Sequence, residues 1–187
     1  MRIIAGSAKG RTLKTLKGLE TRPTLDRVRE AVFNTLREKV IGAKMLDLFA
    51  GSGAIGIEAL SRGATHCYFN DQNKKACQII KENLRKCNFM ERSRVFAMDG
   101  LKLIFYLQEQ DRVKFDVIYL DPPYLSGDYA TYLQKLEESG LLAENCIIIA
   151  ESRKTLTLAD EYQRLRLLKR RDYGDTAIWY YNFLGEE

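Results

Sequence analysis

Proline, histidine and tryptophan are scarce in this chain, which has three prolines, one histidine and one tryptophan in 187 residues. So few prolines exclude collagen-like and proline-rich linker proteins. No apolar run approaches the roughly 18 residues that a membrane-spanning helix needs, and the first residues turn polar too early for a signal peptide. The four cysteines show neither a C-x-x-C pair nor the spacing of zinc ligands. We therefore expect a cytoplasmic protein with buried, reduced thiols, no metal and no membrane contact.

Acidic side chains are scarce at the N-terminus. Residues 1–29 hold eight Lys or Arg but only Glu20 and Asp26, a local charge of +6, whereas the whole chain carries +5. A nearly neutral body with a basic head suggests an anionic partner, with nucleic acid first, and an ordinary solvated surface is the alternative. If six charges meet phosphates, the log–log slope of affinity against salt is expected to be about −4 to −5. A second basic run, residues 169–171, is too short to support an argument alone.

Apolar runs alternate with amphipathic stretches after residue 42, which predicts parallel βαβ units in an α/β fold. Helices are expected after an N-cap at Thr24 and at 54–62, 74–86, 101–109 and 129–138. Strands are expected at 2–5, 11–16, 45–49, 68–70, 94–97, 115–120 and 146–150, with a last antiparallel hairpin from 163–171 and 177–183. This order predicts a Rossmann-like, mostly parallel seven-stranded sheet with helices on both faces. Residues 1–40 are expected to form a small hairpin-and-helix extension of a domain spanning 41–187.

A glycine-rich loop follows the strand expected at 45–49. Gly51, Gly53 and Gly56 fit G-x-G-x-x-G between a strand and a helix, and Asp71 stands twenty positions after Gly51, where a carboxylate can bind both hydroxyls of a ribose. A nicotinamide dehydrogenase and another nucleoside-cofactor enzyme both fit this pattern. Asp47, four residues before the first glycine, would repel a pyrophosphate but suits a cation. The sequence therefore favours S-adenosylmethionine, which carries a sulfonium and an ammonium and no phosphate.

Other polar residues follow the remaining strands. Asp99 stands two residues past the third strand of the α/β region, where it fits either a contact to the adenine amino group or the N-cap of the next helix. Glu151 ends its strand and could line the pocket, but pairing with a nearby Arg is the favoured interpretation. His66 is expected on the surface or in the core without a catalytic role. Trp179 and the Tyr180–Tyr181 pair are expected to pack in the hairpin.

The most specific signal is Asp121-Pro122-Pro123-Tyr124, directly after the strand at 115–120. Consecutive prolines fix φ and cannot continue a sheet ladder, so the Asp121 carboxylate and the Pro122 carbonyl are expected side by side. Two acceptors suit an exocyclic base amine: they hold both N–H groups, and the carboxylate stabilises the charge that develops as a methyl group arrives. Tyr124 can stack on the base for about 1–3 kcal/mol. A base reached in this way must be unstacked or single-stranded.

The motifs together closely resemble those of the bacterial 16S rRNA guanine-N2 methyltransferases, the small-subunit methyltransferase D family. The matching segments are residues 2–6, 9–11, 22–30, 47–53, 58–64, 121–124 and 173–176, so the similarity spans nearly the whole chain. Asp-Pro-Pro-Tyr alone is shared with DNA amino-methyltransferases, and the N-terminal segments narrow the resemblance to the rRNA family. Asn70 stands where such folds often have Glu or Asp before the ribose-binding position.

The resemblance implies methyl transfer from S-adenosylmethionine to the N2 of one guanine in 16S rRNA, free or in the 30S subunit, by a monomer. It implies catalytic roles for Asp121, Pro122 and Tyr124. Cofactor binding is expected at Asp47, Phe49, Gly51, Gly53, Asp71 and Asp99. The resemblance also brings residues 24–29 near the cofactor or the target base, so that, with the basic head, substrate contacts are expected at Arg11, Arg22, Thr24, Arg27 and Arg29.

Two other classes of function stay open at this stage. A DNA adenine or cytosine amino-methyltransferase shares the Asp-Pro-Pro-Tyr motif, but 187 residues leave no room for a separate target-recognition domain. A non-enzymatic RNA-binding module could use the same fold as a scaffold. It predicts RNA affinity that survives loss of Asp47 and Asp121, without uptake of S-adenosylmethionine.

Overall fold

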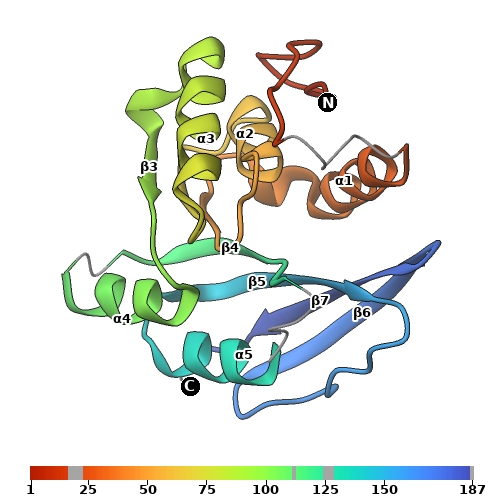
Figure 1. Cartoon of the computed structure of the whole chain (residues 1–187). Coiled ribbons are helices and arrows are strands. Elements are labelled where there is room, and N and C mark those ends of the chain that lie inside the picture. The colour runs from red at the N-terminus through yellow and green to blue at the C-terminus, as the bar shows by residue number, and fades with distance from the viewer. Residues whose placement is uncertain (17–22, 111–112, 124–128, 186–187) are drawn as a thin grey trace.

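A computed structural model describes residues 1–16, 23–110, 113–123 and 129–185, and one seven-stranded sheet forms its centre (Figure 1). The strand order is β3-β2-β1-β4-β5-β7-β6. The strands are β1 (Lys44–Asp47), β2 (His66–Asn70), β3 (Ser93–Phe96), β4 (Phe115–Leu120), β5 (Leu142–Arg153), β6 (Leu165–Tyr173) and β7 (Thr176–Phe183). The first five are parallel, and β7 runs antiparallel to both β5 and β6. The predicted Rossmann-like sheet with a C-terminal antiparallel hairpin is thus confirmed.

Helices cover both faces of the sheet (Figure 1). They are α1 (Pro23–Leu36), α2 (Ala54–Ser61), α3 (Lys74–Cys87), α4 (Gly100–Gln110) and α5 (Tyr129–Glu138), with short 3-10 helices η1 (Arg37–Val40) and η2 (Met90–Arg92). One buried cluster joins α1, α2 and α3 to one face of the sheet, and a second joins α4 and α5 to the other. Parallel strands covered on both faces read as nearly continuous apolar runs, which explains why 115–120 and 146–150 were visible in the sequence.

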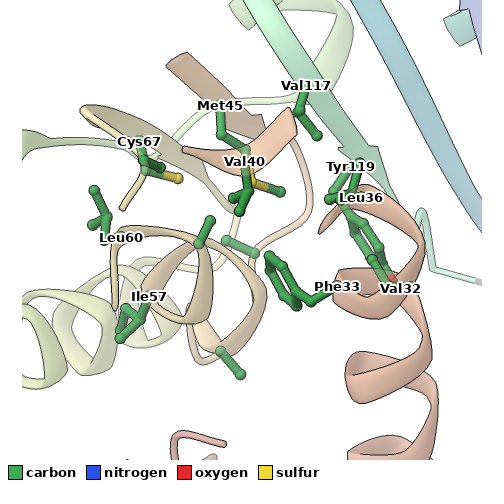
Figure 2. Packing of buried hydrophobic residues seen from close by; sticks show 14 of the residues in the cluster. Val32, Phe33, Leu36, Val40, Met45, Ile57, Leu60, Cys67, Val117 and Tyr119 are labelled. Atoms are coloured by element: carbon green, nitrogen blue, oxygen red, sulfur yellow. The ribbon is translucent and has the colours of Figure 1, made fainter. Parts of the chain in front are cut away.

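The N-terminal segment shares the first of these clusters. Ile3 and Leu13 are buried there with Val32 and Phe33 of α1, and Figure 2 shows the Phe33 side chain reaching from α1 towards α2. Residues 1–40 and the rest of the chain thus pack into one apolar cluster. The division of the chain at residue 40 stays a prediction.

Two expectations for the N-terminal segment are wrong. Residues 2–5 and 11–16 do not form strands; a single antiparallel bridge joins Arg2 and Thr12. Helix α1 begins at Pro23, which puts Thr24 inside the helix instead of at its N-cap. Proline is favoured at the first helical position because its missing N–H would lack an intrahelical partner there in any case.

The C-terminal hairpin packs as expected. Trp179, Tyr180 and Tyr181 are buried, and Gly174 has a φ of +59° in the turn between β6 and β7. His66 is exposed at the start of β2. The four cysteines are buried and not in disulfides.

The described residues contain neither a candidate membrane-spanning helix nor a candidate metal site. None of their helices is long and apolar enough to cross a bilayer. They also contain no group of three or more His, Cys, Asp or Glu placed to hold a metal ion.

Candidate active site

A cavity of about 630 Å³ opens at the carboxyl ends of β1, β2, β4 and β5. In parallel α/β sheets this edge is where ligands bind. Its lining is acidic, with the carboxylates Asp47, Asp71, Asp99, Asp121 and Glu151. Arg29 is the one Lys or Arg among the described residues that line it. A cavity with this balance favours a cationic ligand over an anionic one.

The glycine loop leads from β1 into α2. Gly51 has a φ of +55° and Gly53 a φ of +79°, in the left-handed region that favours glycine. Gly51 lines the cavity, and an added Cβ there would meet nothing within 4 Å, so the space beside this backbone is open to a ligand. At Gly53 a Cβ would instead lie 3.2 Å from Ile80 of α3. The first glycine thus serves ligand approach, and the second serves close packing.

Asp47 ends β1 at the floor of the cavity. Its side chain is 1% exposed and accepts a hydrogen bond of 3.1 Å from the backbone N–H of Gly56 in α2. Burial raises the pKa of Asp47 to about 7, with a further contribution from the charge of Asp71, and the Gly56 N–H partly opposes this rise. A cation placed beside this carboxyl group would favour its ionised form.

At the end of β2, Asn70 and Asp71 have different roles. Asp71 accepts hydrogen bonds from the backbone N–H groups of Gly51 (2.9 Å) and Asn73 (2.8 Å). A carboxylate has about four acceptor positions, so two stay available for ribose hydroxyls. The buried Asn70 side chain donates to the carbonyls of Leu48 and Met98 and accepts from the Met98 N–H. Asn70 therefore ties together the strand ends, which favours Asp71 as the ribose-binding residue.

The third strand end carries Asp99. Its carboxylate accepts from the N–H groups of Leu101 (3.1 Å) and Lys102 (3.2 Å) at the start of α4, and it also lines the cavity. The N-cap interpretation of Asp99 is therefore confirmed, and its contact with adenine stays a prediction. Phe49 lines the same wall and packs edge-to-face on Tyr132, with ring centroids 5.1 Å apart. A Cβ at Gly100 would lie 3.1 Å from the Phe49 ring, so this wall admits no larger residue without moving.

Asp121 and Glu151 follow neighbouring strands. Leu120 of β4 is paired with Ala150 of β5, so Asp121 and Glu151 stand side by side at the cavity edge. Asp121 keeps partial solvent exposure. Desolvation nevertheless raises its pKa well above the ordinary value, and the nearby Glu151 and Asp47 raise it further. Pro122 is buried and Pro123 exposed beside it, and both line the cavity.

Within the described part of the chain, Glu151 pairs with no arginine, which corrects the expectation from the sequence. Its carboxylate accepts a buried hydrogen bond from the Tyr119 hydroxyl, and its backbone carbonyl accepts one from the Tyr129 hydroxyl. Tyr119 sits two residues before Asp121, on the same face of β4, and lines the cavity too. Burial raises the pKa of Glu151, and the Tyr119 hydrogen bond partly offsets this. The Tyr119–Glu151 pair was invisible in the sequence because it depends on the pairing of β4 with β5.

The arginines expected to contact substrate lie in different environments. Arg29 is 2% exposed; it donates to the Arg2 carbonyl, pairs with Asp26 at 3.2 Å and approaches Glu58 at 3.8 Å. It therefore reaches the cavity wall but not the outer surface. Arg11 donates to the Lys86 carbonyl from an exposed position, and Arg27 is exposed. Arg22 and Tyr124 lie outside the described residues, as does the Thr24 side chain.

Two polar residues that the sequence did not single out hold the N-terminal segment beside the cavity. The fully buried Glu58 of α2 accepts from the N–H groups of Ile4 and Ala5 and from Arg62. The Asn83 amide of α3 bonds the N–H and carbonyl of Lys14 and the carbonyl of Ser52 in the glycine loop. An acid or amide on the apolar face of a helix is the only signal in the sequence that could have revealed them, because their partners in the N-terminal segment and the glycine loop are more than 30 residues away.

Comparison with known proteins assigns the family. The family model described as Conserved hypothetical protein 95 matches residues 1–182. The Bacillus subtilis protein YlbH, which carries a provisional rRNA methyltransferase name, is 38% identical over 99% of this chain and 100% of its own. Ribosomal RNA small subunit methyltransferase D of Haemophilus influenzae is 37% identical over 93% of this chain and 89% of its own. The Escherichia coli protein yhhF, described provisionally as a methyltransferase, superposes with a TM-score of 0.85 at 31% identity, over 100% of this chain and 99% of its own. The chain therefore belongs to the Conserved hypothetical protein 95 family, a methyltransferase family that includes the small-subunit rRNA methyltransferase D of Haemophilus influenzae.

Proposed function

We propose that this protein transfers a methyl group from S-adenosylmethionine to the exocyclic N2 amine of a guanine in 16S rRNA of the small ribosomal subunit. The observation that carries the proposal is the acidic cavity at the ends of β1, β2 and β4, in which the glycine loop and Asp121-Pro122 share one space. The family names of the relatives support rRNA of the small subunit as the substrate class.

The cavity fits S-adenosylmethionine better than a dinucleotide. Five carboxylates face the space, and its one lining arginine, Arg29, is already placed against Asp26 and Glu58. A pyrophosphate would meet this acidic wall without a free cation, whereas an ammonium and a sulfonium gain from it. When bound, S-adenosylmethionine supplies a methyl group on a positively charged sulfur. Asp47, Phe49, Gly51, Asp71 and Asp99 would hold it. Gly53, also expected to bind the cofactor, would act indirectly by keeping the loop packed against α3.

Asp121 and Pro122 would position the target amine. The carboxylate and the carbonyl accept the two N–H bonds, which directs the nitrogen lone pair out of the base plane and towards the cofactor. Ionised Asp121 stabilises the positive charge that forms on the nitrogen as its new C–N bond is made. The raised pKa of Asp121 also makes it a better acceptor for the proton that the nitrogen then loses.

The target base must leave its stack to reach Asp121, which lies at the cavity edge. The prediction that Tyr124 stacks on that base concerns a residue outside the described part of the chain. Recognition of guanine and of its N2 rests on the resemblance to the rRNA family and on the paired acceptors at the end of β4.

Transfer of labelled methyl groups to 16S rRNA and to 30S particles, followed by nucleoside analysis, tests the proposal. The expected product is N2-methylguanosine, at a site that is unmodified in cells lacking the protein. Asp121→Ala is expected to lower kcat by about 10²–10⁴-fold while cofactor binding in calorimetry stays intact. Methyl groups found only on DNA adenine or cytosine would contradict the proposal, as would RNA binding that survives loss of Asp47 and Asp121 without cofactor uptake.

A further inference from the structure

A cluster of three cations lies where α1 ends against the outer strand β6. It consists of Arg37, Lys169 and Arg171, which we call the α1–β6 basic cluster. Lys169 is paired with Tyr180 of β7, and Arg171 with Ile178, so both side chains lie on the face of the sheet that packs against α1. Arg170, between them, lies on the opposite face, where its guanidinium stacks on Trp179 at 4.6 Å. Successive side chains of β6 point to opposite faces of the sheet. In the basic run 169–171, Arg170 therefore packs on one face, and the other two cations face α1.

Among the residues that the structure describes, the three cations have no acidic partner. Lys169 donates to the Thr35 hydroxyl at 3.3 Å and lies 5.0 Å from the centre of the Tyr180 ring. In the part of the chain that the structure describes, none of the three forms an ion pair with a carboxylate, whereas Lys14, Lys135 and Arg170 do. Glu38, which follows Arg37, forms no ion pair with it either.

Repulsion among the three positive charges of the cluster acts on the pKa of Lys169. Desolvation lowers the pKa of Lys169, and the charges of Arg171 and Arg37 lower it further. Like charges gathered without counter-ions cost free energy, which a bound anion would offset. Arg37 and Arg171 are exposed, so an anion can reach them.

The cluster lies in line with the candidate active site. Arg171 is paired with Ile178, and Ile178 with Glu151, which stands beside Asp121. At about 4.8 Å per strand, the Arg171 backbone is roughly 10 Å from that of Glu151. The basic groups and the two carboxylates thus share one face and one end of the sheet. Ile178 itself is fully buried, so a polyanion with one unit at Asp121 would reach the exposed Arg37 and Arg171 across the groups that cover this row.

We propose that the α1–β6 basic cluster binds the sugar–phosphate backbone of the RNA strand that carries the target base. The inference rests on the proposed function and adds a second contact surface, distinct from the basic head at residues 1–29. Arg37 and Arg171 neutralise phosphates, and Lys169 keeps the potential positive between them. Phosphate contacts of this kind position a strand without reading its sequence.

The test compares two variants in which glutamine replaces basic residues. Arg37→Gln/Arg171→Gln removes the two exposed cations, and Lys114→Gln, at the opposite end of β4 from Asp121, is the control that removes an exposed cation elsewhere. Filter binding to an unmodified 16S rRNA transcript is measured as a function of salt. The double variant is expected to bind roughly tenfold or more weakly at about 0.1 M salt, with a log–log slope reduced by about 1.4–1.8. Calorimetry with S-adenosylmethionine should be unchanged in both, and KM for RNA should rise while kcat holds.

Each outcome decides something. A double variant whose affinity and slope match those of Lys114→Gln overturns the inference. So does a loss of affinity seen with 30S particles but absent with the naked transcript, because the partner of the cluster would then be a ribosomal protein. If the wild-type protein methylates no rRNA yet the slope still falls in the double variant, the phosphate surface is supported and the proposed methyl transfer fails.

Discussion

Asp47 shows how one buried residue couples cofactor binding to pH. Its pKa is raised to about 7, so a large fraction of the free protein carries the neutral acid at neutral pH. A cation in the cavity favours the ionised form, so binding and proton release are linked. We therefore expect the affinity for S-adenosylmethionine to rise by up to about tenfold between about pH 6 and about pH 8. Calorimetry at the two pH values measures this, and a wild-type profile as flat as that of Asp47→Asn would contradict it.

The same residue affects stability in the opposite direction. Because the folded pKa lies above the ordinary value of 3.8, the folded state without cofactor holds a proton that the unfolded chain has lost. The contribution of Asp47 to stability is therefore most favourable below about pH 4 and declines as pH rises towards 7. Asp47→Asn should raise the free energy of unfolding at about pH 8 by about 2–4 kcal/mol and change it little at about pH 4. Urea denaturation of the cofactor-free protein is the measurement, and equal changes at both pH values would refute this account.

Glu151 should set the pH range in which Asp121 is active. Desolvation and the neighbouring Glu151 raise the pKa of Asp121, and Asp121 has to be ionised to accept both amine protons. Activity is therefore expected to increase as pH rises through that pKa. Replacing Glu151 with Gln removes one of the causes, so the acidic limb of the kcat/KM profile should move to lower pH. Tyr119→Phe is the matched variant, since it removes the hydrogen bond but keeps the carboxylate; a limb that does not move in Glu151→Gln refutes the coupling.

At the residue scale, the sequence could predict features that depend on nearby residues in the chain, but not contacts between distant segments. Asp47, Asp71, Asp99 and Asp121 were identified because each ends an apolar strand or follows one within a few residues, a local pattern, and all four line one cavity. Arg29 was expected to contact substrate; it lines the cavity, but its guanidinium is buried between acids from α1 and α2. The partner of Glu151 was mistaken because it is decided by strand register. Local order reveals which groups reach an edge; pairing between distant strands decides what they touch there.

Helix α2 anchors the N-terminal segment through a close backbone approach at Gly6. This glycine has a φ of +82°, and a Cβ added to it would lie 1.8 Å from the Ser61 carbonyl oxygen. Gly10 has nearly the same φ, +81°, but its Cβ would meet nothing within 4 Å. Gly6→Ala should therefore lower the free energy of unfolding by about 1–3 kcal/mol more than Gly10→Ala, because only the first adds a clash to the strain. Urea denaturation compares them, with hydrogen exchange at the Ile4 and Ala5 amides as a local readout; equal losses would contradict the close-approach argument.

Elements were predicted best where burial is continuous. β4 and α5 have the predicted bounds, and α2 and α3 differ by one residue at their ends. β5 extends well beyond the expected 146–150: residues 151–153 at its C-terminal end are paired with β7, and Leu142 at its N-terminal end is paired with Phe115 of β4. The N-terminal strands failed for a different reason. Residues 1–3 and 11–13 do exchange backbone hydrogen bonds. Ile4, Ala5 and Lys14 bond instead to side chains of α2 and α3, which ends this pairing, and nothing local in residues 2–16 signals that.

At the scale of the whole molecule, the first forty residues complete an apolar core that they share with the sheet. Val28, Val32, Phe33 and Leu36 of α1 are at most 3% exposed and pack with Tyr119, Ile149 and Tyr180 of the sheet. A fragment of residues 41–187 would expose that face to water, at a cost of about 1.5–3 kcal/mol for each large apolar side chain uncovered. We expect this fragment to lose cooperative unfolding and to bind a hydrophobic dye. A sharp urea transition in the isolated fragment would contradict the shared core.

The position of β7 has a consequence for synthesis on the ribosome. The last strand of the chain is not at the border of the sheet; it lies between β5 and β6, which do not touch each other. Until residue 183 has left the exit tunnel, the inner edge of β5 has no partner and the wall behind Glu151 is missing. A nascent chain that stops a few residues short would therefore leave an open template for aberrant pairing. The sheet can therefore close only after β7 has been synthesised.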